Sequence, residues 1–175
     1  VVISFEDANA TMMYRSRWIK TQVRQLMKGD LLFIDCDTII NHSLEELDTI
    51  KCEVGAVCES NLPINQFCMP LYQPMCANAH TIGWNPEGEQ FYFSSGVIYA
   101  KDTHATHHLF KLWHQYWQEG LEKGINIDQP SLAKANIECE HIIQRIEDKW
   151  NCIMFTYPRW TREANILHFA AYRNM

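Results

Sequence analysis

An apolar run that ends in two acidic residues constrains the fold of this chain more than any other feature. Residues 31–34 are Leu-Leu-Phe-Ile, and Asp35 and Asp37 follow directly. A short, continuous apolar run is typical of a strand buried on both faces of a layered α/β sheet. Ligands of such sheets bind beyond the carboxyl ends of the strands, so we expect both carboxylates to lie in a binding site.

The spacing of the acidic pair favours a metal site. On an extended chain Asp35 and Asp37 point to the same side, where their charges repel each other unless a cation compensates. Mg²⁺ and Mn²⁺ take oxygen ligands and commonly bridge to substrate phosphates. We therefore expect Asp35 and Asp37 to bind Mn²⁺ or Mg²⁺. The alternative is a polar turn after a strand, with Asp37 capping it.

The rest of the chain alternates between strand and helix patterns. Strands are expected at 1–5, 54–58, 91–100, 152–155 and 166–169, and helices at 10–28, 106–119 and 129–136. Ser-Leu-Glu-Glu at 43–46 is a capping box that opens a short helix. Prolines within 63–86 predict only helical pieces near 66–71 and 75–80. The alternation predicts one α/β domain over 1–175, with a mostly parallel central sheet flanked by helices.

The helix expected at 10–28 is basic. From Thr11 to Lys28 it carries five of the chain's 15 Lys and Arg residues and no acidic residue. A guanidinium suits bidentate phosphate contact. We expect Arg17 and Lys20 to face a phosphate or a sugar; the alternative is a basic, solvated surface.

Composition excludes some classes of protein. The formal net charge of -6 argues against a general nucleic-acid binder. No apolar stretch approaches the ~18–20 residues of a membrane span, and no signal peptide is recognisable. The seven cysteines include no C-x-x-C pair, which favours reduced, mostly buried thiols in a cytoplasmic protein. The chain opens on Val1 rather than Met, which suggests a fragment of a longer protein.

Several segments taken in order resemble a known family. They are Arg-Ser-Arg-Trp-Ile-Lys at 15–20, Gly-Asp-Leu-Leu-Phe-Ile-Asp-Cys-Asp-Thr-Ile-Ile at 29–40, Phe-Ser-Ser-Gly-Val-Ile-Tyr-Ala-Lys at 93–101, Asp-Gln-Pro at 128–130 and Ile-Leu-His-Phe at 166–169. Together they resemble GT-A-fold glycosyltransferases, most closely the bacterial family 8-like group. The resemblance runs from about Tyr14 to Phe169 and implies a GT-A-like nucleotide-diphospho-sugar transferase fold.

The resemblance implies how a metal and a donor would be held. Asp35 and Asp37 match the D-x-D motif of the family, which binds Mn²⁺ and the donor diphosphate. His168 matches a third metal ligand, although a histidine in an apolar strand is also compatible with a core position. Arg17 matches an arginine that contacts the donor sugar.

Four further residues match segments near the reacting sugar. Ser95 and Gly96 match a stretch whose backbone passes close to the donor. Asp128 and Gln129 match an Asp-Gln pair beside the reacting sugar carbon, and Asp128 is also a candidate helix N-cap.

The implied activity is hexosyl transfer. The donor would be a nucleoside-diphosphate sugar, expected to be a UDP-sugar, and the acceptor a carbohydrate or glycolipid, with retention of anomeric configuration. The first strand of the family has no obvious counterpart before Val1, so roughly the first third of such a domain would be missing. We expect either that the chain is a fragment or that the nucleotide is held differently. This leaves open a non-catalytic nucleotide-sugar or glycan binding module. A phosphatase of the haloacid dehalogenase type also carries D-x-D after a strand, but Ile39 stands where that class favours Thr or Val.

Overall fold

The computed structural model of the chain describes residues 10–154 and 162–169. The strand expected at 1–5 and the end of the strand expected at 152–155 lie outside these residues. The described α-helices are α1 (Met12–Leu26), α2 (Met69–Ile82), α3 (His104–Glu122) and α4 (Gln129–Glu138). The strands are β1 (Leu31–Ile34), β2 (Thr38–Ile40), β3 (Val54–Cys58), β4 (Phe93–Ala100), β5 (Ile143–Arg145), β6 (Cys152–Ile153) and β7 (Ile166–His168). Short 3-10 helices are η1 (Glu45–Thr49), η2 (Glu59–Asn61), η3 (Ile64–Gln66) and η4 (Asp148–Trp150).

The strands form a four-stranded sheet, β1-β4-β3-β5, and a three-stranded sheet, β2-β7-β6. Strand β4 runs antiparallel to both β1 and β3, and β2 is antiparallel to β7, whereas β3–β5 and β6–β7 are parallel. The α/β class with flanking helices is confirmed, but the described strands do not form a mostly parallel sheet. A continuous apolar run indicates burial on both faces and says nothing about the direction of the neighbouring strand.

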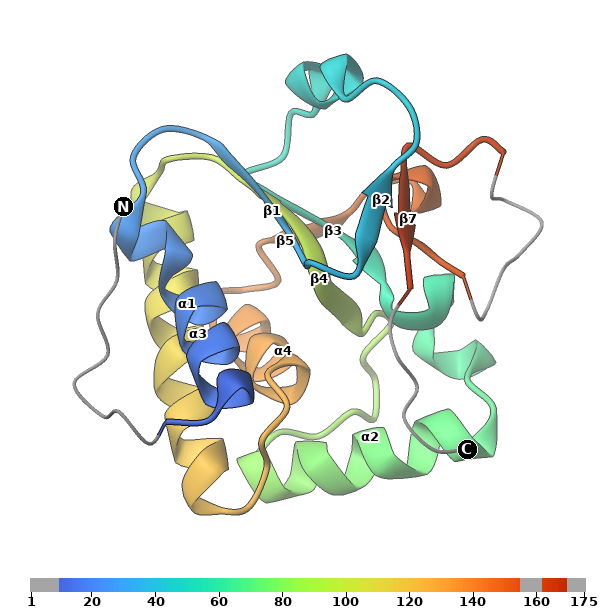
Figure 1. Ribbon diagram of the computed structural model, residues 1–175. Helices are drawn as coiled ribbons and strands as arrows, with labels where there is room; N and C mark the ends of the chain where they lie inside the picture. The colour runs from blue at the N-terminus through green and yellow to red at the C-terminus, as the bar shows by residue number, and fades with distance from the viewer. Residues whose placement is uncertain (1–9, 155–161, 170–175) are drawn as a thin grey trace.

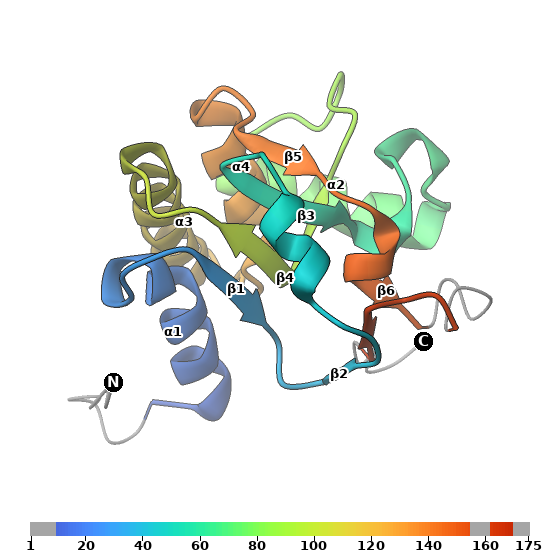
Figure 2. The same ribbon diagram turned by 90° about the horizontal axis from the view of Figure 1, so that it is seen from above.

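Helices cover one face of the larger sheet, and the short helix η1 lies over the other (Figures 1 and 2). Strand β3 shows why both faces are apolar, because successive side chains point to opposite sides. Val54 and Ala56 join the main core with α3 and α4. Val57 packs instead with Leu47 of η1 and Trp150.

Local capping signals explain where the two long helices begin. Thr11 caps α1 by accepting a hydrogen bond from the Tyr14 backbone N–H, 3.2 Å away. Thr103 and Thr106 form a reciprocal capping box, so α3 begins at His104, ahead of the expected start at 106. Among the described helices, none combines the length and apolar character that a bilayer span requires.

Two local expectations were only partly right. The Ser-Leu-Glu-Glu box does precede a short helix, but the helix is the 3-10 turn η1, and Ser43 Oγ accepts from the Glu45 N–H at 3.2 Å. The two helical pieces expected within 63–86 are one continuous helix, α2, which contains Pro74. Its buried Met75 and Ile82 pack against a local core, and such packing outweighs the backbone hydrogen bond that a proline removes.

Candidate metal and donor site

Strand pairing brings the acidic pair and His168 together. Asp35 follows β1, and its backbone N–H donates to the Gly96 carbonyl of β4 at 2.8 Å. Asp37 leads into β2, whose first residue, Thr38, pairs with His168 at the end of β7. One ligand atom each from Asp35, Asp37 and His168 lies within 4.8 Å of the others, as expected from the sequence.

The chemistry of this cluster fits a divalent cation. Two carboxylates and one imidazole are donors that divalent metals accept, and carboxylates suit Mn²⁺ and Mg²⁺ in particular. The Asp37 side chain is 48% exposed, so the cluster is open to solvent. His168 Nε2 faces Asp37 Oδ1 at 3.3 Å, while its Nδ1 lies 2.9 Å from Asn151 Oδ1. A positive charge between Nε2 and the carboxylate would stabilise this pair.

A buried charge network adjoins the cluster. Lys20 of α1 is only 2% exposed, and its Nζ lies 2.8 Å from Asp35 Oδ2. The same ammonium donates to Ser95 Oγ at 3.2 Å and lies 3.6 Å from Asp128 Oδ2. Arg17, one turn earlier on α1, places Nε 2.8 Å from Asp128 Oδ1. Two cations from the basic helix therefore meet two carboxylates inside the protein.

The two carboxylates respond differently to this environment. Burial raises the pKa of Asp35, and the charge of Lys20 opposes that effect only in part. Burial by itself would also raise the pKa of Asp128. The charges of Lys20 and Arg17 outweigh this effect and hold the pKa of Asp128 below its usual value. Asp128 is thus kept as a carboxylate although it is almost fully buried.

Asp128 and Gln129 stand at the start of α4. Asp128 occupies the N-cap position, but its side chain makes no capping hydrogen bond within the described structure. Its backbone carbonyl accepts from Trp113 Nε1 at 2.9 Å, which ties it to α3. Gln129 Nε2 donates to Glu59 and to the Phe93 carbonyl, 3.5 Å away. The capping alternative for Asp128 therefore has no hydrogen bond to support it.

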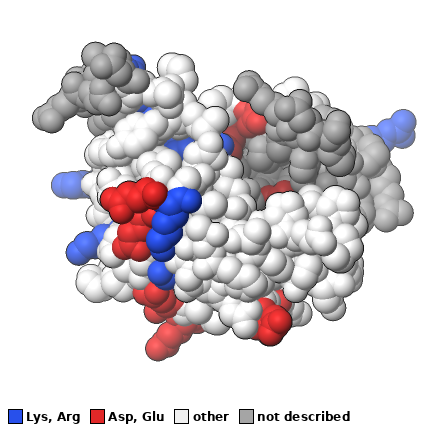
Figure 3. Space-filling model, turned by 90° about the horizontal axis from the view of Figure 1, so that it is seen from below, with Lys and Arg blue, Asp and Glu red and all other residues white. Residues whose placement is uncertain are grey.

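The basic helix does not form a patch of a single charge sign. Arg17 and Lys20 point to carboxylates, and only the Arg17 side chain, 29% exposed, retains access to solvent. Mixed charge is also seen elsewhere on the molecule, since basic and acidic side chains lie next to one another on the face seen from below (Figure 3). The expected contact with a phosphate or sugar is consequently better placed on Arg17 than on Lys20.

Sequence reasoning missed two residues of this region, Glu59 and Asn151. Glu59 directly follows β3, so the rule that ligands bind beyond strand ends could have found it. Asn151 follows η4 and is fully buried, with no sequence pattern to mark it.

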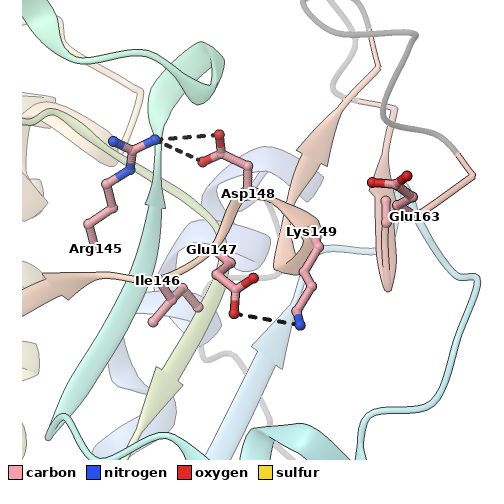
Figure 4. A pocket seen from close by; sticks show the side chains of 7 residues that line it. Arg145, Ile146, Glu147, Asp148, Lys149 and Glu163 are labelled. Atoms are coloured by element: carbon pink, nitrogen blue, oxygen red, sulfur yellow. Dashed lines mark hydrogen bonds and ion pairs between the residues drawn. The ribbon is translucent and has the colours of Figure 1, made fainter.

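A separate cavity of about 490 Å³ lies beside η4 and contains none of the cluster residues. Four of its charged side chains pair with one another, Arg145 with Asp148 and Lys149 with Glu147, and Glu163 also lines the cavity (Figure 4). Because Asp35, Asp37 and His168 do not line it, this cavity is separate from the metal cluster.

The fold is that of GT-A-type glycosyltransferases. The chain belongs to glycosyl transferase family 8, whose family model matches residues 13–172. This membership removes the dehalogenase-type phosphatase from consideration. No curated protein sequence matches the chain significantly.

Solved structures of glycosyltransferases share the fold. The galactosyltransferase LgtC, in complex with donor and acceptor sugar analogs, superposes with a TM-score of 0.62 at 14% identity, over 97% of this chain and 62% of that one. Mouse xyloside xylosyltransferase 1 superposes with a TM-score of 0.55 at 15% identity, and the match covers 95% of this chain and 68% of that one. A glycosyltransferase involved in glycosylation of the major capsid of PBCV-1 superposes with a TM-score of 0.58 at 13% identity, and the match covers 98% of this chain and 78% of that one. The chain thus spans less than two thirds of the galactosyltransferase.

Proposed function

We propose that this chain carries the metal and donor site of a glycosyltransferase that moves a hexose from a nucleoside-diphosphate sugar to a carbohydrate or glycolipid acceptor. The observation that carries this proposal is the convergence of Asp35, Asp37 and His168 beside the ionised, buried Asp128. Membership of family 8 supports transfer as the reaction, and a UDP-sugar is the donor we expect.

Asp35, Asp37 and His168 would hold Mn²⁺ or Mg²⁺. When bound, the ion supplies Lewis-acid stabilisation of the diphosphate that leaves. Lys20 neutralises Asp35 from behind and fixes the direction of its carboxylate, so that the other oxygen can face the site. The side chain of Asp37 is half exposed, so a diphosphate would reach the proposed ion from the solvent side.

Asp128 and Arg17 act on the sugar side of the proposed reaction. The transition state of glycosyl transfer is oxocarbenium-like, and a fixed carboxylate such as Asp128 stabilises its positive charge. Arg17 orients that carboxylate through Nε and can reach a donor oxygen with its remaining N–H groups. Gln129 is held through Nε2, which leaves its carbonyl oxygen to orient a hydroxyl. We propose retention, with a leaving phosphate oxygen as the base for the acceptor.

We also propose a reducing, cytoplasmic setting. All seven cysteines lie within the described residues and form no disulfide. Cys52, Cys58 and Cys152 are buried, Cys76 and Cys139 are partly buried, and Cys36 and Cys68 are exposed, so the expectation of mostly buried thiols is only partly met.

Donor binding tests the proposal. Nucleotide sugars are screened for Mn²⁺-dependent thermal stabilisation of this chain and of a longer parent, and the best donor is titrated by calorimetry. Asp37→Asn is expected to abolish Mn²⁺-dependent binding without loss of stability, because Asp37 is half exposed. The matched control is Asp48→Asn in the exposed part of η1. Unchanged metal-dependent affinity in Asp37→Asn would refute the proposed site.

Turnover separates transfer from binding alone. Release of nucleoside diphosphate from the bound donor, with or without added acceptor sugars, supports the enzyme. Metal-dependent binding with no turnover in the longer parent would instead establish a non-catalytic binding module.

A further inference from the structure

Asn151 is the residue that holds His168 in place. It is fully buried, and its Oδ1 lies 2.9 Å from His168 Nδ1. A carbonyl oxygen only accepts hydrogen bonds, so the ring nitrogen facing it must carry the proton. In a neutral imidazole the other nitrogen, Nε2, then keeps its lone pair, and this atom faces Asp37 at 3.3 Å.

Asn151 is itself held from two sides. Its backbone carbonyl accepts from Asn61 Nδ2 at 3.0 Å, and its backbone N–H donates to the Asp148 carbonyl at 3.1 Å. Asn61 in turn accepts from the Ile153 N–H at 3.0 Å, which locks η2 to β6. Asn61 has φ of 55°, a left-handed conformation that asparagine tolerates better than most residues. The backbone carrying the Asn151 side chain is therefore immobilised next to β7.

The side-chain amide of Asn151 is not arranged to stabilise the fold. Its Nδ2 is buried and finds no hydrogen-bond partner among the described residues. An unsatisfied buried donor is destabilising, so an apolar residue would serve the core better. Among residues 10–154 and 162–169, the side chain of Asn151 makes one hydrogen bond, and its partner is His168.

We propose that Asn151 is a positioning residue, which fixes the Nδ1–H tautomer and the ring orientation of His168 so that Nε2 is presented to the cation. The proposal rests on the proposed function, because the cation is the one assigned to Asp35, Asp37 and His168. The opposite amide orientation would place the proton on Nε2, where it would donate to Asp37 and block the ligand position. The tautomer thus decides whether the cluster can bind a metal.

The tautomer can be read directly in the metal-free protein. Long-range ¹H–¹⁵N correlation spectra of the histidine rings distinguish a protonated from an unprotonated Nδ1, and His168→Gln assigns the signal. We expect the wild-type chain to show Nδ1–H and a lone pair on Nε2, and Asn151→Ala to show a mixture. A wild-type ring protonated on Nε2 alone, or an Asn151→Ala ring with unchanged tautomer, overturns the proposal.

Calorimetric titration with MnCl₂ measures the consequence. Asn151→Ala is expected to weaken Mn²⁺ binding by roughly 10- to 100-fold, the usual effect of removing the group that orients a metal-binding histidine. Asn151→Asp keeps an acceptor for Nδ1–H and should stay within about threefold of wild type. The control is Asn136→Ala, which removes a buried asparagine of α4 that accepts from the Ile143 N–H at 2.9 Å, whereas His168 lies in β7.

The outcomes separate this proposal from the proposed function. If Asn151→Ala does not fold, Asn151→Asp decides, since a large loss of Mn²⁺ affinity there counts against the proposal and near wild-type affinity supports it. If wild type binds no Mn²⁺, the proposed function fails, while the tautomer measurement still tests the role of Asn151.

Discussion

The ring of His168 lies directly against the backbone of Gly96. A Cβ atom at position 96 would stand 2.2 Å from His168 Cε1 and 2.7 Å from Nδ1. Only a residue without a side chain allows this approach, and the backbone of Gly96 is not in the left-handed region. The close approach seen in the structure is therefore made by a proposed metal ligand, while the expected approach of Ser95 and Gly96 to the donor stays a prediction.

Gly96→Ala should therefore displace His168. We expect Mn²⁺ affinity to fall at least about tenfold, because the ring can no longer hold Nε2 beside Asp37. Forcing a methyl group into this buried position should also lower the free energy of unfolding by about 1–3 kcal/mol. Calorimetry and urea denaturation measure the two effects.

The matched control is Gly55→Ala in β3. Its Cβ would lie 2.8 Å from Ile146 Cγ2, so a comparable loss of stability is expected. Since a Cβ at Gly55 would meet Ile146 and Cys52 rather than His168, which lies in the other sheet, Mn²⁺ affinity should be retained. Equal loss of affinity in both variants would mean that overpacking alone explains the defect at Gly96.

Lys20→Met should destabilise the fold strongly. The ammonium is 2% exposed, and its removal leaves the carboxylates of Asp35 and Asp128 facing each other without their shared cation. Breaking a buried ion pair from one side typically costs about 3–5 kcal/mol. Urea denaturation should show this loss, and adding Asp35→Asn should recover part of it.

Lys149→Met is the comparison for that experiment. Lys149 pairs with Glu46 and Glu147 at the surface, where ion pairs contribute about 0–1 kcal/mol. Equal stability of the two lysine variants would contradict a stabilising role for the buried ion pairs of Lys20 with Asp35 and Asp128.

His114 should make the protein sensitive to acid. Burial lowers the pKa of His114, whose Nδ1 lies 2.8 Å from Thr21 Oγ1 in a pocket of aromatic rings. Below the ordinary value of about 6.5 the unfolded chain takes up a proton that the folded chain resists. The stability associated with neutral His114 is therefore present above about pH 6.5 and lost as the pH falls, by at most about 1.4 kcal/mol per pH unit.

His114→Gln should flatten this dependence. Denaturation curves at several values between about pH 7.5 and pH 5.5 give the slope for wild type and variant. Asp35 and Asp128 are present in both chains, so their contributions cancel when the slope of unfolding free energy against pH in the variant is subtracted from that in wild type. Identical slopes would show that His114 does not titrate with folding.

The cysteines should fall into reactive and protected groups. Cys36 and Cys68 are exposed and should react quickly with a thiol reagent in the native protein. Burial raises the pKa of Cys58 to about 11, and the pKa of Cys52 is raised for the same reason, so both should be protected. Mass spectrometry after brief labelling identifies the modified positions, and rapid labelling of Cys58 would contradict the packing of β3.

Local sequence patterns were sufficient for most of the elements. The apolar run before Asp35, the amphipathic pattern of α3 and the strand pattern of β3 act between near neighbours, so one sequence can show them. Proline misled the prediction for α2, because the packing of Met75 and Ile82 is not visible locally. Strand direction also escaped prediction, since a buried apolar strand has the same composition beside a parallel or an antiparallel neighbour.

The sequence by itself determined the acidic pair and its place at a strand end, because the adjacency of apolar and acidic residues is a property of the chain. Only the tertiary structure decided the rest of the site. Pairing of β2 with β7 brings His168 to Asp37 across 131 positions. Lys20, expected from the sequence to face a phosphate or a sugar, is buried and pairs with Asp35. Asn151 acquires its role in the same way, because a hydrogen bond depends on proximity in space, which the order of residues does not display.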